Sequence, residues 1–406
     1  MLTDSSQVPV LGPLSAFGAG FADALAQQGY TPRAARNQIG LLAHLSSWLL
    51  DEGLSADELH TTAVERFVRA RRAAGYTLLL SIKAMQPILA YLRGLGVAPT
   101  PPPPMPDGPV EVALEQYRSY LTVERGLGAA TARGYVDAVR LFLRSRVVPD
   151  GLALDLGHLT AADVISFVVA RCPRQGHSAA RLTVTALRSL LGFLHVEGTI
   201  ERSLASAVPS VASRRLAGLP RGLDPDQVRR LLASCDSSTR NGCRDFAILT
   251  VLVRLGLRAG EVATLALDNI DWRAGEIVVH GKANCTERLP LPTDVGEALA
   301  AYLHRGRPAS AHGRSVFVRI KAPHRSLSSG GVTQVVAAAA RRAGLGRIHA
   351  HRLRHTAATQ MLRVGASLPD IGQLLRHRRA LTTAIYAKVD HDALRKIARP
   401  WPGDVA

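Results

Sequence analysis

The stretch from His351 to Tyr386 decides how the rest of the chain is interpreted. Its informative points are His351-Arg352-Leu353-Arg354-His355, Leu374-Leu375-Arg376-His377 and Ala384-Ile385-Tyr386. The first box lies in an amphipathic helical pattern, and His351 and Arg354 share one face of that helix because they are three residues apart. Cationic hydrogen-bond donors followed by a single tyrosine provide what attack on a phosphodiester requires. An ordinary basic helix would also fit, so the remaining sequence has to distinguish the two.

A metal site is the alternative raised by three nearby histidines, His349, His351 and His355. No carboxylate completes a His-Glu-x-x-His pattern, and Arg352 and Arg354 inside the cluster would repel a cation. The cluster therefore favours an anion site, and we predict no metal. We expect His355 to be a buried, hydrogen-bonded helix residue that supports the site.

Only two tyrosines follow position 224 of the chain. Tyr302 belongs to an apolar helical repeat with Leu299 and Leu303, which indicates a core position. Tyr386 follows a thin, polar segment at 381–385, so we expect it to be presented to a partner molecule rather than buried.

Two upstream segments carry further candidates. Arg258 follows Gly256, which is expected to end an apolar helix, so it can project from the N-terminus of the next helix, where an anion is also favoured. Glu261, one turn later, is expected to hold the local backbone or a neighbouring arginine. Lys282 lies at a predicted hairpin tip and is the sole lysine between positions 84 and 320. A lysine can release a proton far more readily than an arginine, which makes it a candidate general acid.

The net charge points to a polyanionic partner. The 406 residues carry a formal net charge of +18, and nucleic acid is the polyanion that such a surplus usually serves. Arginine accounts for nearly all of the basic residues, which a proteome-wide preference for arginine would explain. That preference does not explain the surplus of positive over negative charges.

Cysteine usage and the N-terminal sequence indicate the cellular compartment. The four cysteines are scattered without a Cys-x-x-Cys pair, so neither a disulfide framework nor a zinc site is indicated. The first residues lack the pattern of a signal peptide, and the apolar run at 246–257 is too short to span a bilayer. These features predict a cytoplasmic protein that is not associated with a membrane.

Three domains joined by two linkers are predicted. The prolines at 100–109 form a stiff linker, and a basic connector covers 211–222. They separate helical domains at 1–99 and 110–210 from a third domain at 223–406. Matched apolar positions one hundred residues apart indicate that the first two domains are duplicates, with Thr31 and Thr131 each placed ahead of a helix. Chance similarity between two amphipathic bundles is the alternative.

The third domain contains the only strong strand pattern. Alternating residues at 270–272, 276–280 and 287–291, separated by turns, predict a three-stranded antiparallel meander. Asp224 starts a helix, a long buried helix covers 246–255, and helices resume near Asp294 and continue almost to the end. The predicted fold class is therefore mainly α with one small sheet.

Taken together, these boxes resemble the tyrosine recombinase (phage integrase) family, including its Xer-like members, over residues 223–395. The resemblance implies a catalytic domain preceded by two helical, SAM-like DNA-binding domains. The matching catalytic positions, in the family's order, are Arg258, Lys282, His351, Arg354, His377 and Tyr386, with Glu261 and His355 as supporting residues. The sequence departs from the pattern at Arg376, where the family customarily has glycine, and this departure adds charge without removing a reacting group.

The resemblance implies a site-specific DNA recombinase. Tyr386 would attack the scissile phosphate to form a 3′-phosphotyrosyl bond, Arg258 and Arg354 would clamp the phosphate, and His377 would hydrogen-bond it. His351 would assist proton transfer from the tyrosine, and Lys282 would protonate the leaving oxygen. No cofactor is implied, and the implied setting is the bacterial cytoplasm, in association with the nucleoid.

Double-stranded DNA is the implied partner, bound by a homo-oligomer, expected to be a tetramer on two DNA sites. A second recombinase or accessory proteins are further partners. The resemblance also suggests that the domain at 1–99 is either an extra DNA-binding module or a protein-contact module, and that a helical tail with Leu394 and Ile397 docks on a neighbouring protomer.

Three alternatives remain at this point: a type IB topoisomerase, a non-catalytic DNA-binding descendant, and a helical adaptor with a basic surface. The sequence does not give the target site. It also does not distinguish integration or transposition of a mobile element from excision or chromosome-dimer resolution.

Overall fold

The computed structural model describes residues 9–101, 105–212, 222–281 and 286–376, together with Thr383 and Tyr386. The chain divides into two compact units, one of Pro102–Arg215 and the other of Met1–Pro101 with Leu216–Ala406. No helix among the described residues is long and apolar enough to cross a membrane. The predicted linkers at 100–109 and 211–222 are only partly covered by these residues.

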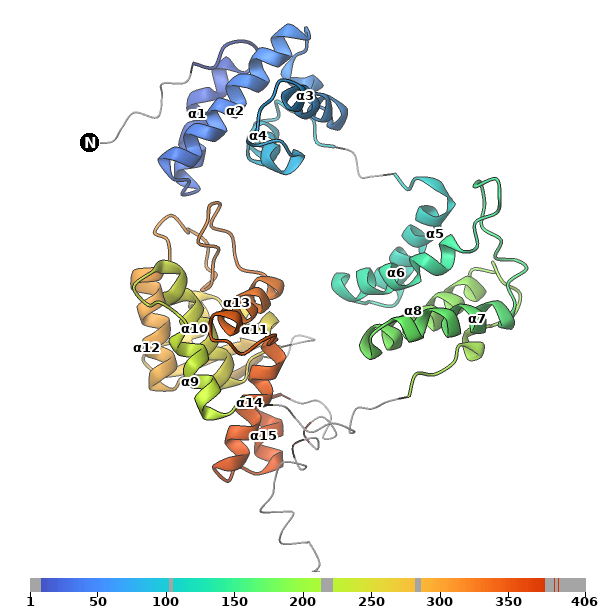
Figure 1. The fold of residues 1–406 in the computed structure, drawn as a ribbon, viewed down its shortest axis with the longest axis vertical. Coiled ribbons are helices and arrows are strands. Elements are labelled where there is room, and N and C mark those ends of the chain that lie inside the picture. Colours follow the sequence, from blue (N-terminus) through green and yellow to red (C-terminus); the bar gives the residue numbers. More distant parts are fainter. Residues whose placement is uncertain are drawn as a thin grey trace, which may run out of the picture. The chain divides into compact units, whose positions relative to one another are not determined.

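The first segment is helical throughout (Figure 1), with α1 (Gly18–Gln27), α2 (Pro32–Asp51), α3 (Thr61–Ala73) and α4 (Ile82–Gly94). Thr31 caps α2, because its side chain accepts a hydrogen bond from the backbone N–H of Ala34. These helices enclose one apolar core that runs from Leu14 to Ala98.

The second unit also contains four long helices, α5 (Gly108–Ser119), α6 (Ala129–Arg144), α7 (Ala161–Arg171) and α8 (His177–Val196). Its core extends from Val110 to Val208, and α6 packs beside α8. Thr131 lies inside α6, whose N-cap is Gly128, so the expectation that Thr131 precedes its helix as Thr31 does was wrong.

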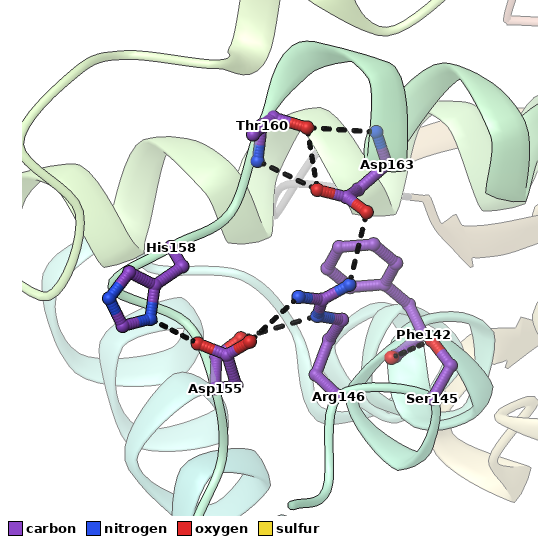
Figure 2. A network of polar contacts seen from close by, with 7 residues as sticks. All are labelled: Phe142, Ser145, Arg146, Asp155, His158, Thr160 and Asp163. Carbon is purple, nitrogen blue, oxygen red and sulfur yellow. Dashed lines mark hydrogen bonds and ion pairs between the residues drawn. The ribbon is translucent and has the colours of Figure 1, made fainter.

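A polar network joins the end of α6 to the start of α7 in this unit (Figure 2). Arg146 Nη2 lies 3.1 Å from Asp155 Oδ2, and Arg146 Nη1 lies 3.2 Å from Asp163 Oδ1. Asp163 also accepts hydrogen bonds from the backbone N–H and the hydroxyl of Thr160, which is the N-cap of α7. The network thus links the residues that follow α6 to the N-terminal cap of α7.

The third segment carries the small sheet. Its strands are β1 (Ile270–Asp271), β2 (Glu276–His280) and β3 (Thr286–Pro290), antiparallel in the order β1-β2-β3. Ile277 pairs with both Ile270 and Leu289, and all three side chains are buried in the core. The predicted meander is confirmed, because alternating apolar residues bury one face of the hairpin.

The helices of this segment share with the sheet one core that extends from Leu223 to Leu353. They are α9 (Pro225–Ala233), α10 (Arg240–Leu255), α11 (Ala259–Ala263), α12 (Thr293–Ala301), α13 (Ser329–Arg342), α14 (Ala350–Arg363) and α15 (Leu368–Leu374). The helix predicted at Asp224 is confirmed, since Asp224 caps α9 through the backbone N–H of Gln227. The helices α12, α13 and α14 all contact α10, whose last turns are almost completely buried.

Short 3-10 and π-helical turns complete the elements. They are η1 (Ser15–Phe17), η2 (Ala56–Glu58), η3 (Tyr120–Glu124), η4 (Cys172–Arg174), η5 (Ala205–Ala207), η6 (Leu267–Asn269) and η8 (Tyr302–Gly306). Tyr302 is fully buried and stacks on Phe317, which confirms that it is a core residue.

Candidate functional site: an arginine cluster beside a buried tyrosine

The junction between α10 and α11 positions Arg258. Gly256 ends α10 with φ +59, a conformation that glycine adopts without strain. A Cβ at this position would lie 2.6 Å from Leu375 Cδ2 and 3.3 Å from Ala357 Cβ, so only glycine lets α10 end against α14 and the loop after α15. Arg258 follows as the N-cap of α11, as the sequence predicted.

Glu261 holds Arg258 in place. Its Oε2 accepts a hydrogen bond of 2.8 Å from the Arg258 backbone N–H, and its Oε1 lies 2.6 Å from Arg258 Nη1. Burial raises the pKa of Glu261, but its hydrogen bond from the Arg258 backbone and the charge of Arg376 outweigh burial, so the net pKa is lowered. Glu261 was expected to hold the local backbone or a neighbouring arginine, and in the structure it holds both.

Arg354 is the most buried charged residue of the cluster, with 1% of its surface exposed. It projects from α14, donates from Nη1 to the Gly256 carbonyl at 2.7 Å, and donates from Nη2 to the Leu375 carbonyl. Burial, followed by the charge of Arg258, lowers its pKa to about 10, so the guanidinium stays charged at neutral pH. The site therefore contains a cation that the fold has placed out of water.

Arg376 is a third arginine of the cluster, and the sequence did not predict its role. Its Nη2 lies 2.7 Å from Glu261 Oε2, and its carbonyl accepts a 3.4 Å hydrogen bond from Arg258 Nη2. The only sequence signal was its replacement of a customary glycine. The partner, Glu261, is more than one hundred residues away in the chain, so no local pattern could have identified it.

Tyr386 is 2% exposed and packs with Ala358, Ile371 and Leu375. The prediction that this side chain is presented rather than buried was wrong. The polar residues before Tyr386 suggested exposure, but the apolar faces of α14 and α15 supply a tertiary pocket that local composition does not reveal. Burial raises the pKa of Tyr386 to about 12, so its hydroxyl is protonated at neutral pH.

His355 makes the contact with this tyrosine. Its Nδ1 lies 2.7 Å from the Tyr386 hydroxyl, and the two rings meet edge to face. Burial, with added repulsion from His351 and Arg354, lowers the pKa of His355 to about 4, so the imidazole is neutral. The sequence predicted a supporting role for His355 but did not predict its direct contact with Tyr386.

His351 lies one turn earlier on α14, with its ring centroid 4.5 Å from that of His355. Its side chain is solvent-exposed, yet contacts that bury part of the ring, and then the charges of Arg354 and Arg258, lower its pKa. Lys282 and His377 lie outside the described residues, as do Leu394 and Ile397 of the predicted tail. The described part of the site thus unites Arg258, Glu261, His351, Arg354, His355 and Tyr386 through α11 and α14.

This geometry suits an anion better than a cation. Three arginines converge from α11, α14 and the end of α15, with Glu261 as the carboxylate that neutralises part of their charge. Among the described residues, no group of three or more histidines, cysteines or carboxylates is placed to hold a metal. Planar guanidinium groups match phosphate oxygens in shape and charge, and the Arg258 side chain is the exposed one of the three, at 43%.

Known proteins share this organisation. Residues 221–392 match the phage integrase family, and residues 114–198 match the phage integrase N-terminal SAM-like domain. A Sinorhizobium fredii protein named as an integrase/recombinase is 42% identical over 98% of this chain and 96% of its own length. The tyrosine recombinase XerD of Listeria monocytogenes is 31% identical over 71% of this chain and 97% of its own.

Solved structures share the fold. A XerH site-specific recombinase in a post-cleavage complex with a palindromic difH substrate covers 83% of this chain and 94% of its own, with a TM-score of 0.55 and 17% identity. A lambda integrase tetramer bound to a Holliday junction covers 81% and 92%, with a TM-score of 0.53 and 18% identity. This chain belongs to the tyrosine recombinase (phage integrase) family and is a site-specific DNA recombinase.

Proposed function

We propose that Arg258, Lys282, His351, Arg354, His377 and Tyr386 carry out DNA cleavage and rejoining, with Glu261 and His355 as supporting residues. The observation that carries this assignment is the 2.7 Å contact between the Tyr386 hydroxyl and His355, because His355 lies on α14, the helix that also carries Arg354. A nucleophilic hydroxyl and a phosphate-binding guanidinium are thereby brought to one end of one helix.

The chemistry follows from the groups present. The Tyr386 oxygen attacks phosphorus, a P–O bond to tyrosine forms, and the bond to the 5′ oxygen breaks. Arg258 and Arg354 bind the non-bridging oxygens and stabilise the charge that develops on them. His351 assists removal of the tyrosine proton, and Lys282 protonates the departing 5′ oxygen. His377 hydrogen-bonds the phosphate, and attack by a new 5′ hydroxyl reverses the steps.

A nicked suicide substrate tests the nucleophile. Cleavage next to the nick releases a short fragment and traps the protein on DNA, so a covalent adduct appears in a denaturing gel. We expect the adduct with the native chain and none with Tyr386→Phe, which keeps the ring and removes the hydroxyl. An adduct of undiminished yield with Tyr386→Phe would show that another residue is the nucleophile.

The upstream domains are proposed to bind DNA around the catalytic domain. We assign 110–210 as a core-binding domain, 1–99 as an additional module, 223–406 as the catalytic domain, and 100–109 and 211–222 as linkers. Three separate apolar cores support these boundaries. Deleting residues 1–105 should shorten the DNA footprint on one flank, and an unchanged footprint would instead assign that module to protein contacts.

A homotetramer on two DNA sites is the proposed assembly, in a cytoplasmic, nucleoid-bound setting, acting on a mobile element. The shared fold with the lambda integrase tetramer on a Holliday junction supports the tetramer. The mass of the complex on a synthetic four-way junction, measured by light scattering, tests it. Four copies per junction are expected, and two copies would contradict the proposal.

Recombination is favoured over a type IB topoisomerase by the additional helical domain at 1–99, which relaxation of a single duplex does not need. A substrate pair with differently labelled arms distinguishes the two. Recombination joins the labels in one product, whereas a topoisomerase reseals each duplex with its own label.

A further inference from the structure

Arg376 occupies a position that is costly for the fold. Its backbone φ is +54, in the left-handed region that favours glycine and strains other residues. Its side chain is only 4% exposed, and its Nε has no hydrogen-bond partner among the described residues. A strained backbone and a buried, unpaired donor both oppose stability, so stability alone does not account for an arginine here.

Arg376 and its neighbour Leu375 contact the two arginines proposed to bind phosphate, Arg258 and Arg354, which together form the clamp. Glu261 Oε2 receives Arg376 Nη2 at 2.7 Å and the Arg258 backbone N–H at 2.8 Å. The Arg376 carbonyl accepts from Arg258 Nη2, and the carbonyl of the preceding residue, Leu375, accepts from Arg354. The short turn after α15 therefore contacts both arginines of the clamp, and the Arg376 side chain fastens that turn to Glu261.

The charge balance gives this contact a chemical consequence. With Arg376, the cluster contains three arginines and one glutamate, a formal charge of +2. With glycine at 376 the charge would be +1, and the full carboxylate charge of Glu261 would act on Arg258 alone. A phosphodiester carries one negative charge, and attack by an oxygen anion raises it to two in the transition state.

We propose that Arg376 is a positioning residue for strand cleavage: its ion pair with Glu261 fixes the turn that holds Arg258 and Arg354 and leaves their charge available to the phosphate. This inference rests on the proposed function of the clamp arginines. It concerns a residue that acts through Glu261, because the Arg376 guanidinium is paired with that carboxylate at 2.7 Å.

The test is the rate of adduct formation at saturating DNA, compared with the DNA dissociation constant of the same variants. Arg376→Gly removes the side chain and the backbone strain together. We expect its cleavage rate to fall by roughly tenfold while DNA affinity and thermal stability change little. Arg376→Lys, which keeps the charge but not the planar fork, should recover part of the rate. An unchanged rate in Arg376→Gly would overturn the proposal.

A second substitution separates this role from a merely structural one. In the Arg376→Gly background, Glu261→Gln removes the unbalanced carboxylate but keeps an oxygen to cap the Arg258 N–H, so the rate should rise again. In the native background the same Glu261→Gln strips Arg376 of its partner and should lower the rate. The effect of one substitution thus changes sign with the residue at 376. Equal effects in both backgrounds would refute the charge balance.

A matched control is Arg229→Ala, which removes one positive charge from an exposed pair with Asp226 on α9. Its cleavage rate at saturating DNA should match that of the native chain. A loss equal to that of Arg376→Gly would show that total charge, not this ion pair, sets the rate, and would overturn the proposal. Absence of any adduct with the native chain would instead count against the proposed function.

Discussion

Two arginine networks in this molecule have opposite compositions. In the SAM-like unit, one arginine, Arg146, bridges two carboxylates, Asp155 and Asp163 (Figure 2). In the catalytic domain, one carboxylate, Glu261, bridges two arginines, and a third arginine lies beside them. Where acids outnumber the arginine, the cation is fully used in holding helices together. Where arginines outnumber the acid, positive charge is left over for a ligand.

The contrast between the two networks would fail most clearly if cleavage did not need Arg354. Arg354→Ala should reduce adduct formation by about a thousandfold, because it removes a buried phosphate donor and leaves the Gly256 and Leu375 carbonyls without their partner. Single-turnover cleavage on the nicked substrate measures this loss. Arg354→Lys, which keeps one charge, should retain more activity. A loss below tenfold in Arg354→Ala would remove Arg354 from the clamp.

Lys282 gives the next largest effect. Lys282→Ala should slow cleavage by about a hundredfold, since the leaving 5′ oxygen loses its general acid. A substrate with sulfur at the leaving position needs no protonation, so its cleavage should be equally fast with the native chain and the variant. If sulfur fails to restore the rate, Lys282 has a different role from proton donation.

The two networks should differ in how their contribution to folding stability depends on pH. The pKa of His355 is lowered from 6.5 to about 4 by burial, and by His351 and Arg354. The unfolded chain therefore binds a proton that the folded chain does not, and the stability of the catalytic domain should decrease as the pH falls from about 6.5 toward 4.

The acids of the SAM-like unit behave differently. A hydrogen bond from His158 lowers the pKa of Asp155, and one from Thr160 lowers that of Asp163, both from 3.8. Their contribution should remain until the pH falls below that value. Urea unfolding at pH 7, 5 and 3.5 measures how the stability of each part depends on pH. His355→Gln should remove the loss of stability of the catalytic domain between pH 7 and 5 and leave the pH dependence of the SAM-like unit unchanged. An unchanged pH dependence of the catalytic domain would contradict the role given to His355.

The smallest effect is expected from Arg146→Ala. Loss of its partly buried contacts should lower the free energy of unfolding of the SAM-like unit by about 1–2 kcal/mol. The cleavage rate of DNA that is already bound should not change. Calorimetry and single-turnover cleavage together check this result, and a slower chemical step would give the acid-rich network a catalytic role that its composition does not suggest.

The sequence predicted those parts of the fold that depend on neighbouring residues. Asp224 capped its helix, Gly256 ended another, and the alternation around Ile277 formed the meander. Thr131 failed as a helix start because Gly128 began the helix earlier. For the site, the contacts of Glu261 with the Arg258 backbone and side chain and the core position of Tyr302 were predicted correctly.

What could not be predicted depends on packing between distant segments. The exposure expected for Tyr386 was inferred from five preceding residues, but its burial is determined by Ala358, Ile371 and Leu375 on other turns and helices. Arg376 was recognised as a departure from the family pattern, but its ion pair with Glu261 depends on how α15 ends against α11. Such contacts require the tertiary structure.

The burial of Tyr386 has a kinetic consequence. In this structure the Tyr386 side chain is 2% exposed, packs against Leu375 and is hydrogen-bonded to His355, so it is withdrawn from solvent. With Tyr386 as the nucleophile, cleavage draws on a minor population in which the side chain has left its pocket, and the observed rate constant is the intrinsic one multiplied by that population. Each 1.4 kcal/mol or so of pocket stability therefore divides the rate by about ten. Any contact with DNA or a neighbouring subunit that draws Tyr386 out of this pocket would raise the cleavage rate.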